Sequence, residues 1–452
     1  MLCFGMLWAR KILYRLYRLA SGTRYHGRRR LTRTGLALLG AAVVAGLMSL
    51  DVTGSLAYQA FLLLSCLLVV SFACAGFFRA RFTAERLLPR FGTVGSPLSY
   101  RVTLRNENRS PQAGLVLLEN LADPRPSFDE YLALREAEEK RIRAFSITRR
   151  RKRLNFELAR VRDVPVPPLL PGQAAEVRFE LTPLKRGHGC FTGLTVARPD
   201  PLGLLKAFTR LPLPQSVLVL PKRYPIPPIA LPGTMKYQQG GVALASSVGE
   251  SEEFVSLREY RAGDPLRHIH WRSWARVGKP VVKEFQDEFF VRHALVLDTF
   301  TDHPLDDTFE EAVSVAASFA CTIQTQESLL DLLFVGTEAY CFTSGRGLAH
   351  TEQMLEILAA VRVCRERGFE ALENLVLDHL SAVSGCICVL LAWDERRQQF
   401  IRRLNLLGLP LLVLVITEPG GKSALAPGPL KDTPERFHVL EAGAVAEGLA
   451  RL

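Results

Sequence analysis

The chain has 452 residues and a net charge of +12 at pH 7, with 48% hydrophobic and 23% charged residues. This composition excludes an intrinsically disordered protein and fits a globular or membrane-associated chain of two or three domains. Nine of the 57 lysines and arginines lie in residues 1–34, which contain no acid, so most of the excess charge belongs to an N-terminal tail. Charge this localised gives no support to nucleic-acid binding by the folded part, and we expect no nucleic-acid partner.

Two apolar segments follow the basic tail, which we place at residues 1–33. Asp51 is the only charged residue between Arg33 and Arg79, and the turn "DVTGS" divides the run into segments 34–50 and 56–78. A helix that crosses a membrane needs about 20 apolar residues, so residues 34–78 predict a hairpin of two transmembrane helices in the lipid bilayer.

Arginines on both sides of this hairpin predict its orientation, because cytoplasmic flanks are enriched in lysine and arginine. We therefore expect a multi-pass membrane protein with both termini and the soluble domains in the cytoplasm. The nine cysteines are scattered and fit buried free thiols in that reducing compartment. The flanking arginines are Arg28, Arg29, Arg30 and Arg33 before the hairpin and Arg79, Arg81 and Arg86 after it.

Residues 79–222 have the pattern of a β-sandwich. The stretch "PLSYRVTLRNEN" alternates apolar and polar residues, which is typical of a half-buried strand, and similar short strands recur between proline- and glycine-containing turns. This rhythm predicts an immunoglobulin-like fold. A segment rich in charge at helical spacing, residues 124–171, is expected to interrupt the sandwich as an insertion.

Residues 291–452 alternate short apolar strands with amphipathic helices. Continuous apolar strands such as "RHALVLD" and "CICVLLAWD" predict a parallel sheet that helices cover on both faces, a Rossmann-type α/β domain. Ligands of such sheets gather at the carboxyl ends of the strands, where Asp298 and Asp394 fall. Since no glycine-rich phosphate loop follows any strand, we expect no nucleotide cofactor.

The segment between these domains, residues 223–290, contains the unusual stretch "LREYRAGDPLRHIHWRSWARVGKP". We expect a strand, then a helix of about three turns that begins at Asp264 as N-cap and ends at Gly278, then a second strand. His268 and His270 are two residues apart and would point to nearly opposite sides of that helix, so a zinc site is not expected.

Two interpretations of this stretch remain open. In the first, arginines pack on Trp271 and Trp274 and pair with nearby acids, either as a clasp between domains or as a docking surface for the acidic loop of a partner. In the second, the segment belongs to an envelope-associated hydrolase. Its polar cluster would then be Asp264, His268, His270 and Glu284.

With these motifs in view, the chain resembles the bacterial domain-of-unknown-function family 58, membrane-anchored proteins with a von Willebrand factor A-like domain. The resemblance rests on the two apolar segments, on "LTPLKRGHG" and "DPLGLL", and above all on "LREYRAGDPLRHIHW" with "ARVGKPVVKEF". It implies a protein of the bacterial inner (plasma) membrane that stands beside MoxR-type AAA+ ATPases, other von Willebrand A proteins and transglutaminase-like membrane proteins. It implies no enzymatic activity, so no catalytic residues are predicted.

A von Willebrand A-like domain also implies a possible metal site. The standard site has a D-x-S-x-S loop with a distant threonine and aspartate, because Mg²⁺ prefers oxygen ligands in an octahedral array. Here the loop carries Phe300 and Asp302 at the two serine positions. A degenerate Mg²⁺ site is therefore one prediction, and a structural carboxylate that caps the strand end at Asp298 is the favoured alternative. The candidate ligands are Asp298, Thr299, Asp302 and Asp394.

The function predicted from the sequence is an integral membrane scaffold or adaptor that acts through cytoplasmic protein–protein interaction. The expected partner is a MoxR-type AAA+ ATPase or another von Willebrand A protein, in the assembly or maturation of other proteins. The residues expected to form the signature or its interaction surface are Arg258, Tyr260, Gly263, Asp264, Arg267, Ile269, Trp271, Ala275, Arg276 and Glu284.

Overall fold

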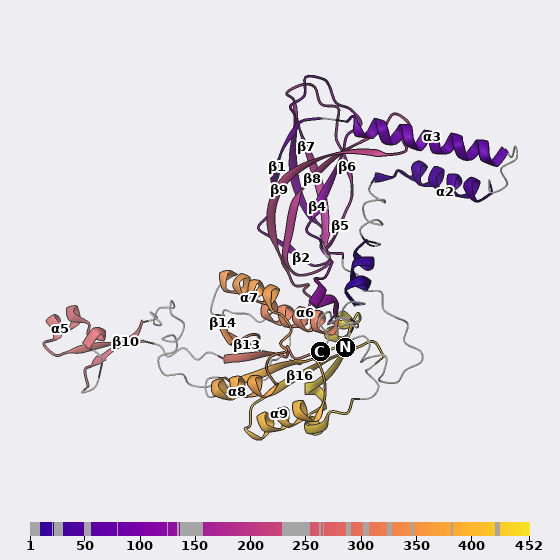
Figure 1. Ribbon diagram of the computed structural model, residues 1–452. Helices are drawn as coiled ribbons and strands as arrows, with labels where there is room; N and C mark the ends of the chain where they lie inside the picture. Colours follow the sequence, from indigo (N-terminus) through magenta and orange to yellow (C-terminus); the bar gives the residue numbers. More distant parts are fainter. Residues whose placement is uncertain are drawn as a thin grey trace. The chain divides into compact units, whose positions relative to one another are not determined.

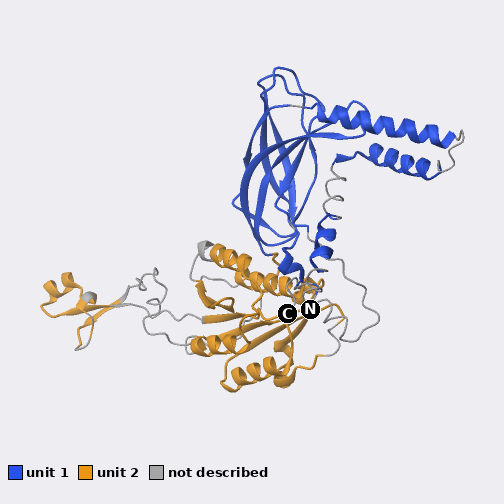
Figure 2. Cartoon of the chain, viewed as in Figure 1, with its two compact units in different colours: residues 1–221 blue, residues 222–452 orange. Residues whose placement is uncertain are grey.

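The computed structural model describes most of the chain, which forms two compact units, Met1–Pro221 and Lys222–Leu452 (Figure 2). The described residues are 10–19, 21, 30–48, 56–78, 80–123, 125–132, 135, 157–227, 254–261, 264, 266–285, 291–301, 307–322, 328–344, 348–380, 383–420 and 425–452.

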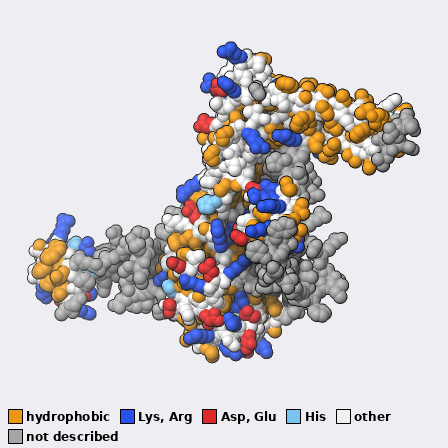
Figure 3. Space-filling model, viewed as in Figure 1, with side chains coloured by type: hydrophobic (Ala, Val, Ile, Leu, Met, Phe, Trp, Pro, Cys, Tyr) orange, Lys and Arg blue, Asp and Glu red, His pale blue; other side chains and the backbone are white. Residues whose placement is uncertain are grey.

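Two apolar helices, α2 (Arg33–Met48) and α3 (Leu56–Gly76), lie side by side in the first unit (Figure 1). Phe61 of α3 packs against Gly46 of α2, where an added β-carbon would lie 3.1 Å from the ring. Hydrophobic side chains cover the surface of both helices that Figure 3 shows. Within the part of the chain described, α3 alone is long and apolar enough to cross a membrane, because α2 has 16 residues. The second membrane span stays a prediction.

A β-sandwich forms the core of the first unit. One sheet has the strand order β1-β3-β7-β5 and the other β2-β9-β8-β4-β6; neighbours are antiparallel except β2 and β9. Side chains of β3 alternate between the core and solvent as the sequence predicted, because Tyr100 and its even-numbered neighbours face the second sheet. The ring of Tyr100 stacks on Phe179 and meets Phe191 of that second sheet edge-on. The strands are β1 (Phe82–Leu87), β2 (Phe91–Thr93), β3 (Leu98–Asn106), β4 (Val116–Leu121), β5 (Ala159–Val161), β6 (Val164–Pro165), β7 (Ala174–Pro183), β8 (Gly187–Pro199) and β9 (Lys206–Leu220).

Arg86 is a core residue of this sandwich, which corrects its expected role as a flank of the membrane helices. Its Nη2 lies 2.6 Å from Oε1 of Glu119, and both side chains are fully buried. The hydroxyl of Tyr100 donates to the other carboxylate oxygen of Glu119 at 2.7 Å. A buried charge is tolerated only with such partners, so Arg86 serves the core.

The predicted insertion, residues 124–171, is shorter than expected. Residues 128–132 are helical. Strand β5 pairs with β7 and β6 pairs with β4, so the sandwich has resumed at Ala159. Strands of two and three residues are too short to show an alternating pattern between charged neighbours. Strands β5 and β6 were therefore predicted to be part of the insertion.

A six-stranded sheet forms the core of the second unit, in the order β14-β13-β12-β15-β16-β17. All neighbours are parallel except β13 and β14. Helices α6 and α7 lie on one side of the sheet, and α8 and α9 on the other (Figure 1). The elements are β12 (Val291–Leu297), α6 (Asp307–Thr322), β13 (Ser328–Val335), β14 (Ala339–Ser344), α7 (Leu348–Ala360), α8 (Glu370–His379), β15 (Gly385–Leu390), α9 (Glu395–Leu406), β16 (Leu411–Thr417), the turns η4 (Gly428–Leu430) and η5 (Pro434–Arg436), β17 (Phe437–Glu441) and α10 (Val445–Leu449).

Burial explains why these strands are apolar on both faces. Ala294 and Val296 of β12 belong to the cluster that includes Phe369 beside α8 and Phe400 of α9, while α6 contacts β12, β15 and β16. The α/β layer with a covered sheet agrees with the sequence, and the antiparallel edge strand β14 is the exception. Of the eight described cysteines, all of them free thiols, only Cys364, Cys386 and Cys388 are buried as expected.

Candidate functional site

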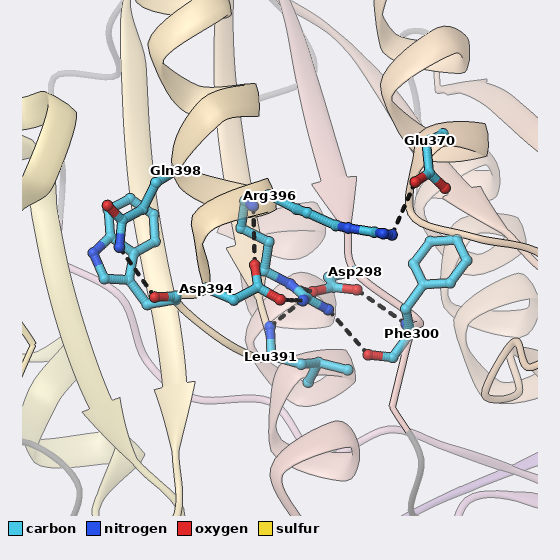
Figure 4. Close-up of polar contacts among 9 residues, drawn as sticks. Asp298, Phe300, Glu370, Leu391, Asp394, Arg396 and Gln398 are labelled. Atoms are coloured by element: carbon cyan, nitrogen blue, oxygen red, sulfur yellow. Dashed lines mark hydrogen bonds and ion pairs between the residues drawn. The ribbon is translucent and has the colours of Figure 1, made fainter.

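The carboxyl edge of the sheet holds a fully buried carboxylate, Asp298, directly after β12. Its Oδ1 accepts the backbone N–H of Phe300 at 3.0 Å, and its Oδ2 accepts the backbone N–H of Leu391 at 3.1 Å (Figure 4). Leu391 directly follows β15. Asp298 therefore ties together the ends of two neighbouring strands.

Arg397 of α9 bridges the two aspartates that the sequence offered as metal ligands. Its Nε lies 2.6 Å from Oδ2 of Asp298, and its Nη1 lies 2.7 Å from Oδ2 of Asp394. Asp394 is also the N-cap of α9, since its Oδ1 accepts the backbone N–H of Arg397 at 3.0 Å. The first turn of α9 thus brings both the arginine and its second carboxylate to the end of β12.

The surroundings of Arg397 favour a permanent positive charge. Burial acts against the charged form, but Asp298 and Asp394 outweigh it and raise the pKa of Arg397. The guanidinium also donates to the carbonyl oxygen of Phe300 at 3.1 Å and lies 4.9 Å from the ring centre of Phe369. The Arg397 side chain is 8% exposed, so this positive charge is buried.

The described residues of this edge do not fit a divalent cation. The guanidinium of Arg397 already binds both carboxylates, and the hydroxyl of Thr299 donates to the carbonyl oxygen of Val335 at 2.5 Å. Phe300 has no side-chain ligand atom, and Asp302 lies outside the described residues. A search of the described residues finds no group of three or more histidine, cysteine, aspartate or glutamate side chains that could hold a metal.

The signature stretch forms a small antiparallel pair, β10 (Phe254–Glu259) and β11 (Val281–Phe285). Arg258 of β10 pairs with Asp264 through two parallel hydrogen bonds of 2.7 and 2.8 Å. Asp264 also accepts the backbone N–H of Arg261 at 2.8 Å. These contacts lower the pKa of Asp264 to about 2, with the Arg258 hydrogen bond as the main cause.

The predicted three-turn helix is wrong, because the chain between the strands forms two shorter pieces. A 3-10 turn, η1 (Leu266–His268), precedes α5 (Trp271–Val277). Between them Ile269 is buried and pairs with Val282, and the backbone N–H of His270 donates to Val281 at 2.8 Å. Attachment to β11 therefore interrupts the helix. The end at Gly278, with φ of 73°, agrees with the prediction.

Helix α5 has no buried residue, and it presents large apolar side chains to solvent. Trp271 is 64% exposed and stacks on Trp274 at 5.2 Å between ring centres, and Val277 is 62% exposed. Arg272 and Arg276 are exposed on the same helix. The expected packing of arginines on the tryptophans, as a clasp between domains, stays a prediction.

The remaining signature residues have varied places. Tyr260 is half-buried and its backbone N–H donates to Pro280, and Ala275 is exposed on α5. The backbone of Arg267 lies in η1 and that of Glu284 in β11, while their side chains and Gly263 fall outside what the structure describes.

Two of the four residues of the polar cluster offered for a hydrolase, Asp264 and His270, are engaged in local contacts. Asp264 is held ionised by Arg258, so it is a poor general acid at neutral pH. The Nδ1 atom of His270 lies 2.6 Å from the hydroxyl of Ser273 on α5 itself.

Arg397 is the residue that sequence reasoning missed. It lies 99 positions from Asp298, so no local pattern connects them. A weak signal existed in "WDERRQQF", where an aspartate that follows a buried strand precedes an arginine by three residues. Such spacing places both side chains on the first turn of a helix.

Two sequence comparisons relate part of this chain to known proteins, one of them to the family described as "Protein of unknown function DUF58". The family model matches residues 256–376, which include α5 and Asp298. A Bacillus subtilis (strain 168) protein, "Uncharacterized protein YeaD", is 28% identical over 185 residues, 40% of this chain. The match spans 44% of that relative's length. Neither description states an activity, and neither names a von Willebrand A domain.

Solved structures resemble parts of the chain only distantly. The solution structure of the CARDB domain of a Pyrococcus furiosus protein is 12% identical, with a TM-score of 0.16, and covers 30% of this chain and 93% of its own. A Salmonella alpha-2-macroglobulin reacted with methylamine is 16% identical, with a TM-score of 0.19, and covers 36% of this chain and 9% of its own. No conclusion is drawn from TM-scores this low.

Proposed function

We propose that this chain is a membrane-anchored adaptor that binds another protein through α5 of the signature stretch. The observation that carries this proposal is the exposure of Trp271 and Val277, together with Leu266 at 68%, beside Arg272 and Arg276. Tryptophan and arginine are the residues most enriched at binding hot spots, and an exposed apolar cluster with a charged border is typical of an interaction site.

The membrane anchor consists of α3 with α2 beside it, and the soluble units face the cytoplasm of a bacterium. Support comes from the length and hydropathy of α3 and from the basic tail before α2. The partner is a MoxR-type AAA+ ATPase, in the assembly or maturation of other proteins. The resemblance to family 58 carries that identification, and the basic border of α5 favours an acidic surface on the partner.

In this proposal, the residues at the carboxyl edge of the α/β sheet stabilise the fold and take no part in metal binding or catalysis. Arg397 supplies the positive charge that a metal ion gives in a competent adhesion site, so the domain needs no Mg²⁺ to keep Asp298 buried. The hydrolase alternative is not favoured, because Asp264 and His270 are bound within the signature itself.

The direct test is equilibrium binding of a purified MoxR-type ATPase to the detergent-solubilised full chain. Replacement of one hot-spot tryptophan costs about 2 kcal/mol or more, so Trp271→Ala should weaken binding about thirtyfold. Leu406→Ala is the matched control, since Leu406 is 81% exposed on α9 and should leave the affinity unchanged. Absence of binding by the wild-type chain would refute the ATPase as partner.

A further inference from the structure

The helix at residues 10–19 has three faces of different chemistry. At about 100° per residue, Tyr14 and Tyr17 share one face and Lys11, Arg15 and Arg18 form a second. The third face is apolar and open to solvent. Its residues are Ile12, Leu13, Leu16 and Leu19, which are 37%, 42%, 57% and 65% exposed.

The aromatic face anchors this helix to residues 126–131, which follow strand β4 of the sandwich. Tyr14 donates its hydroxyl proton to the carbonyl oxygen of Pro126 at 2.9 Å and meets Phe128 edge-on, with 5.4 Å between ring centres. Tyr17 stacks on Tyr131 at the same distance.

A polar contact at Arg18 also holds the helix. Arg125 donates to the carbonyl oxygen of Arg18 at 3.0 Å, while its other nitrogens pair with Asp123 at 2.6 to 2.9 Å. The helix is therefore fixed in rotation, and its leucines point away from the residues that hold it.

We propose that this helix lies in the membrane–water interface and binds anionic lipid. A helix with an apolar face beside lysines and arginines is typical of interfacial helices, whose apolar side chains enter the acyl boundary while the cations meet headgroups. Residues 1–34 contain no acid, so nothing in this stretch opposes an anionic surface.

The position of the helix in the chain supports a lipid rather than a protein partner. The chain enters α2 at Arg33, 14 residues after Leu19. At its start, α2 is fixed to the same sandwich, because the backbone N–H of Thr32 donates to Leu204 at 3.1 Å. The inference rests on the proposed membrane anchor but not on the adaptor role of α5.

The test is photo-crosslinking of the full chain in nanodiscs that contain phosphatidylglycerol with phosphatidylcholine, or phosphatidylcholine alone. A diazirine side chain at position Leu16 should form lipid adducts, in at least fivefold greater yield with the anionic lipid, since each basic residue near an anionic surface contributes about a fivefold factor. A probe at Leu63, 64% exposed on α3, reports the anchor separately. Adducts at Leu63 but not at Leu16 would refute the interfacial helix alone, and adducts at neither would refute the anchor.

A charge variant completes the test. Arg15→Gln should lower the lipid adduct at Leu16 about fivefold in anionic nanodiscs, whereas Arg101→Gln should not, because Arg101 is an exposed residue of the sandwich strand β3. Equal yields in the two kinds of nanodisc, or a main product that links Leu16 to a second copy of the chain, would overturn the proposal.

Discussion

Arg397 is a buried charge of the α/β unit, and its removal leaves Asp298 buried without its main counter-charge. Breaking a buried ion pair by removing one partner costs about 3–5 kcal/mol. We therefore expect Arg397→Ala to lower the free energy of unfolding by that amount. The additional change Asp298→Asn should restore part of the loss, because it removes the unpaired charge.

The unfolding of the wild type, the two single variants and the double variant can be followed by the fluorescence of Trp393. This residue lies beside Asp394 and donates its indole N–H to the carbonyl oxygen of Ala426 at 2.8 Å. In a background with Trp8, Trp271 and Trp274 replaced by phenylalanine, Trp393 fluorescence in urea reports the unit alone. If the double variant were as unstable as the sum of the two single variants, the direct pairing would be disproved.

The same site makes a prediction about metal. Since a guanidinium binds both Asp298 and Asp394, Mg²⁺ or Mn²⁺ should leave the urea midpoint of the wild-type chain unchanged. Stabilisation by either ion that disappears in Asp298→Ala would show that the degenerate adhesion site does bind metal.

His293 makes the α/β unit sensitive to acid. It is 5% exposed in β12, its Nδ1 has no hydrogen-bond partner within the described structure, and burial lowers its pKa. Below pH about 6.5 the unfolded chain takes up a proton that the folded chain resists. Stability is thus complete above the unfolded pKa and falls as the pH drops toward the folded pKa, by at most about 1.4 kcal/mol per pH unit.

The check is the pH dependence of the unfolding free energy in wild type and in His293→Leu. Other titrating groups, including His438, whose pKa burial also lowers, are common to both chains. The variant should have the shallower slope between pH 6.5 and 5, and identical slopes would rule out a contribution from His293.

At the scale of the element, the start of α2 depends on a glycine. A β-carbon on Gly35 would lie 2.1 Å from the carbonyl oxygen of Leu204, closer than any contact allows. The loop that holds Leu204 is itself ordered by Asp200, whose carboxylate accepts the backbone N–H groups of Leu204 and Leu205 at 2.8 Å each and the hydroxyl of Ser71 at 2.7 Å.

The hydrogen bonds to the Asp200 carboxylate have a larger effect on its pKa than its burial has. Burial alone would raise the pKa of Asp200, but the bonds from Ser71 and from the loop N–H groups lower it. The loop "DPLGLL" therefore joins α2 and α3 to the sandwich through one aspartate.

We expect Gly35→Ala to separate α2 from this loop, with faster hydrogen exchange at the amide of Thr32. Gly40→Ala is the control in the same helix, since nothing lies within 4 Å of its β-carbon, and alanine is the better helix former by about 1 kcal/mol. Equal exchange in the two variants would contradict a close contact at Gly35.

Strands with a regular burial pattern were predicted correctly from the sequence, whereas the signature helix was not. Alternation in β3 and continuous apolar strands such as β12 were readable because burial on one or two faces leaves a period in the sequence. The signature helix was misread because Ile269 fits both a helix face and a bridge to Val282. Only the partner strand decides between these two, and it lies beyond any local pattern.

For the whole molecule, the sequence predicted a β-sandwich and an α/β unit with a covered, mostly parallel sheet, but not the arginine that lies between the two aspartates at the edge of that sheet. Asp298 and Asp394 were identified at strand ends, because that position follows from sheet topology. The arginine between them was not, since its role depends on how α9 begins beside β12. The exposure of Trp271 was equally unreadable, because a tryptophan on a short helix is compatible with burial or with binding.

The most direct measurement of the adaptor role is photo-crosslinking in living cells from position Trp271, with Leu406 as the second position. A membrane-anchored adaptor predicts a covalent adduct between the probe at Trp271 and a MoxR-type ATPase, and no such adduct from Leu406. No protein adduct at Trp271, or the same adducts from both positions, would contradict binding through α5.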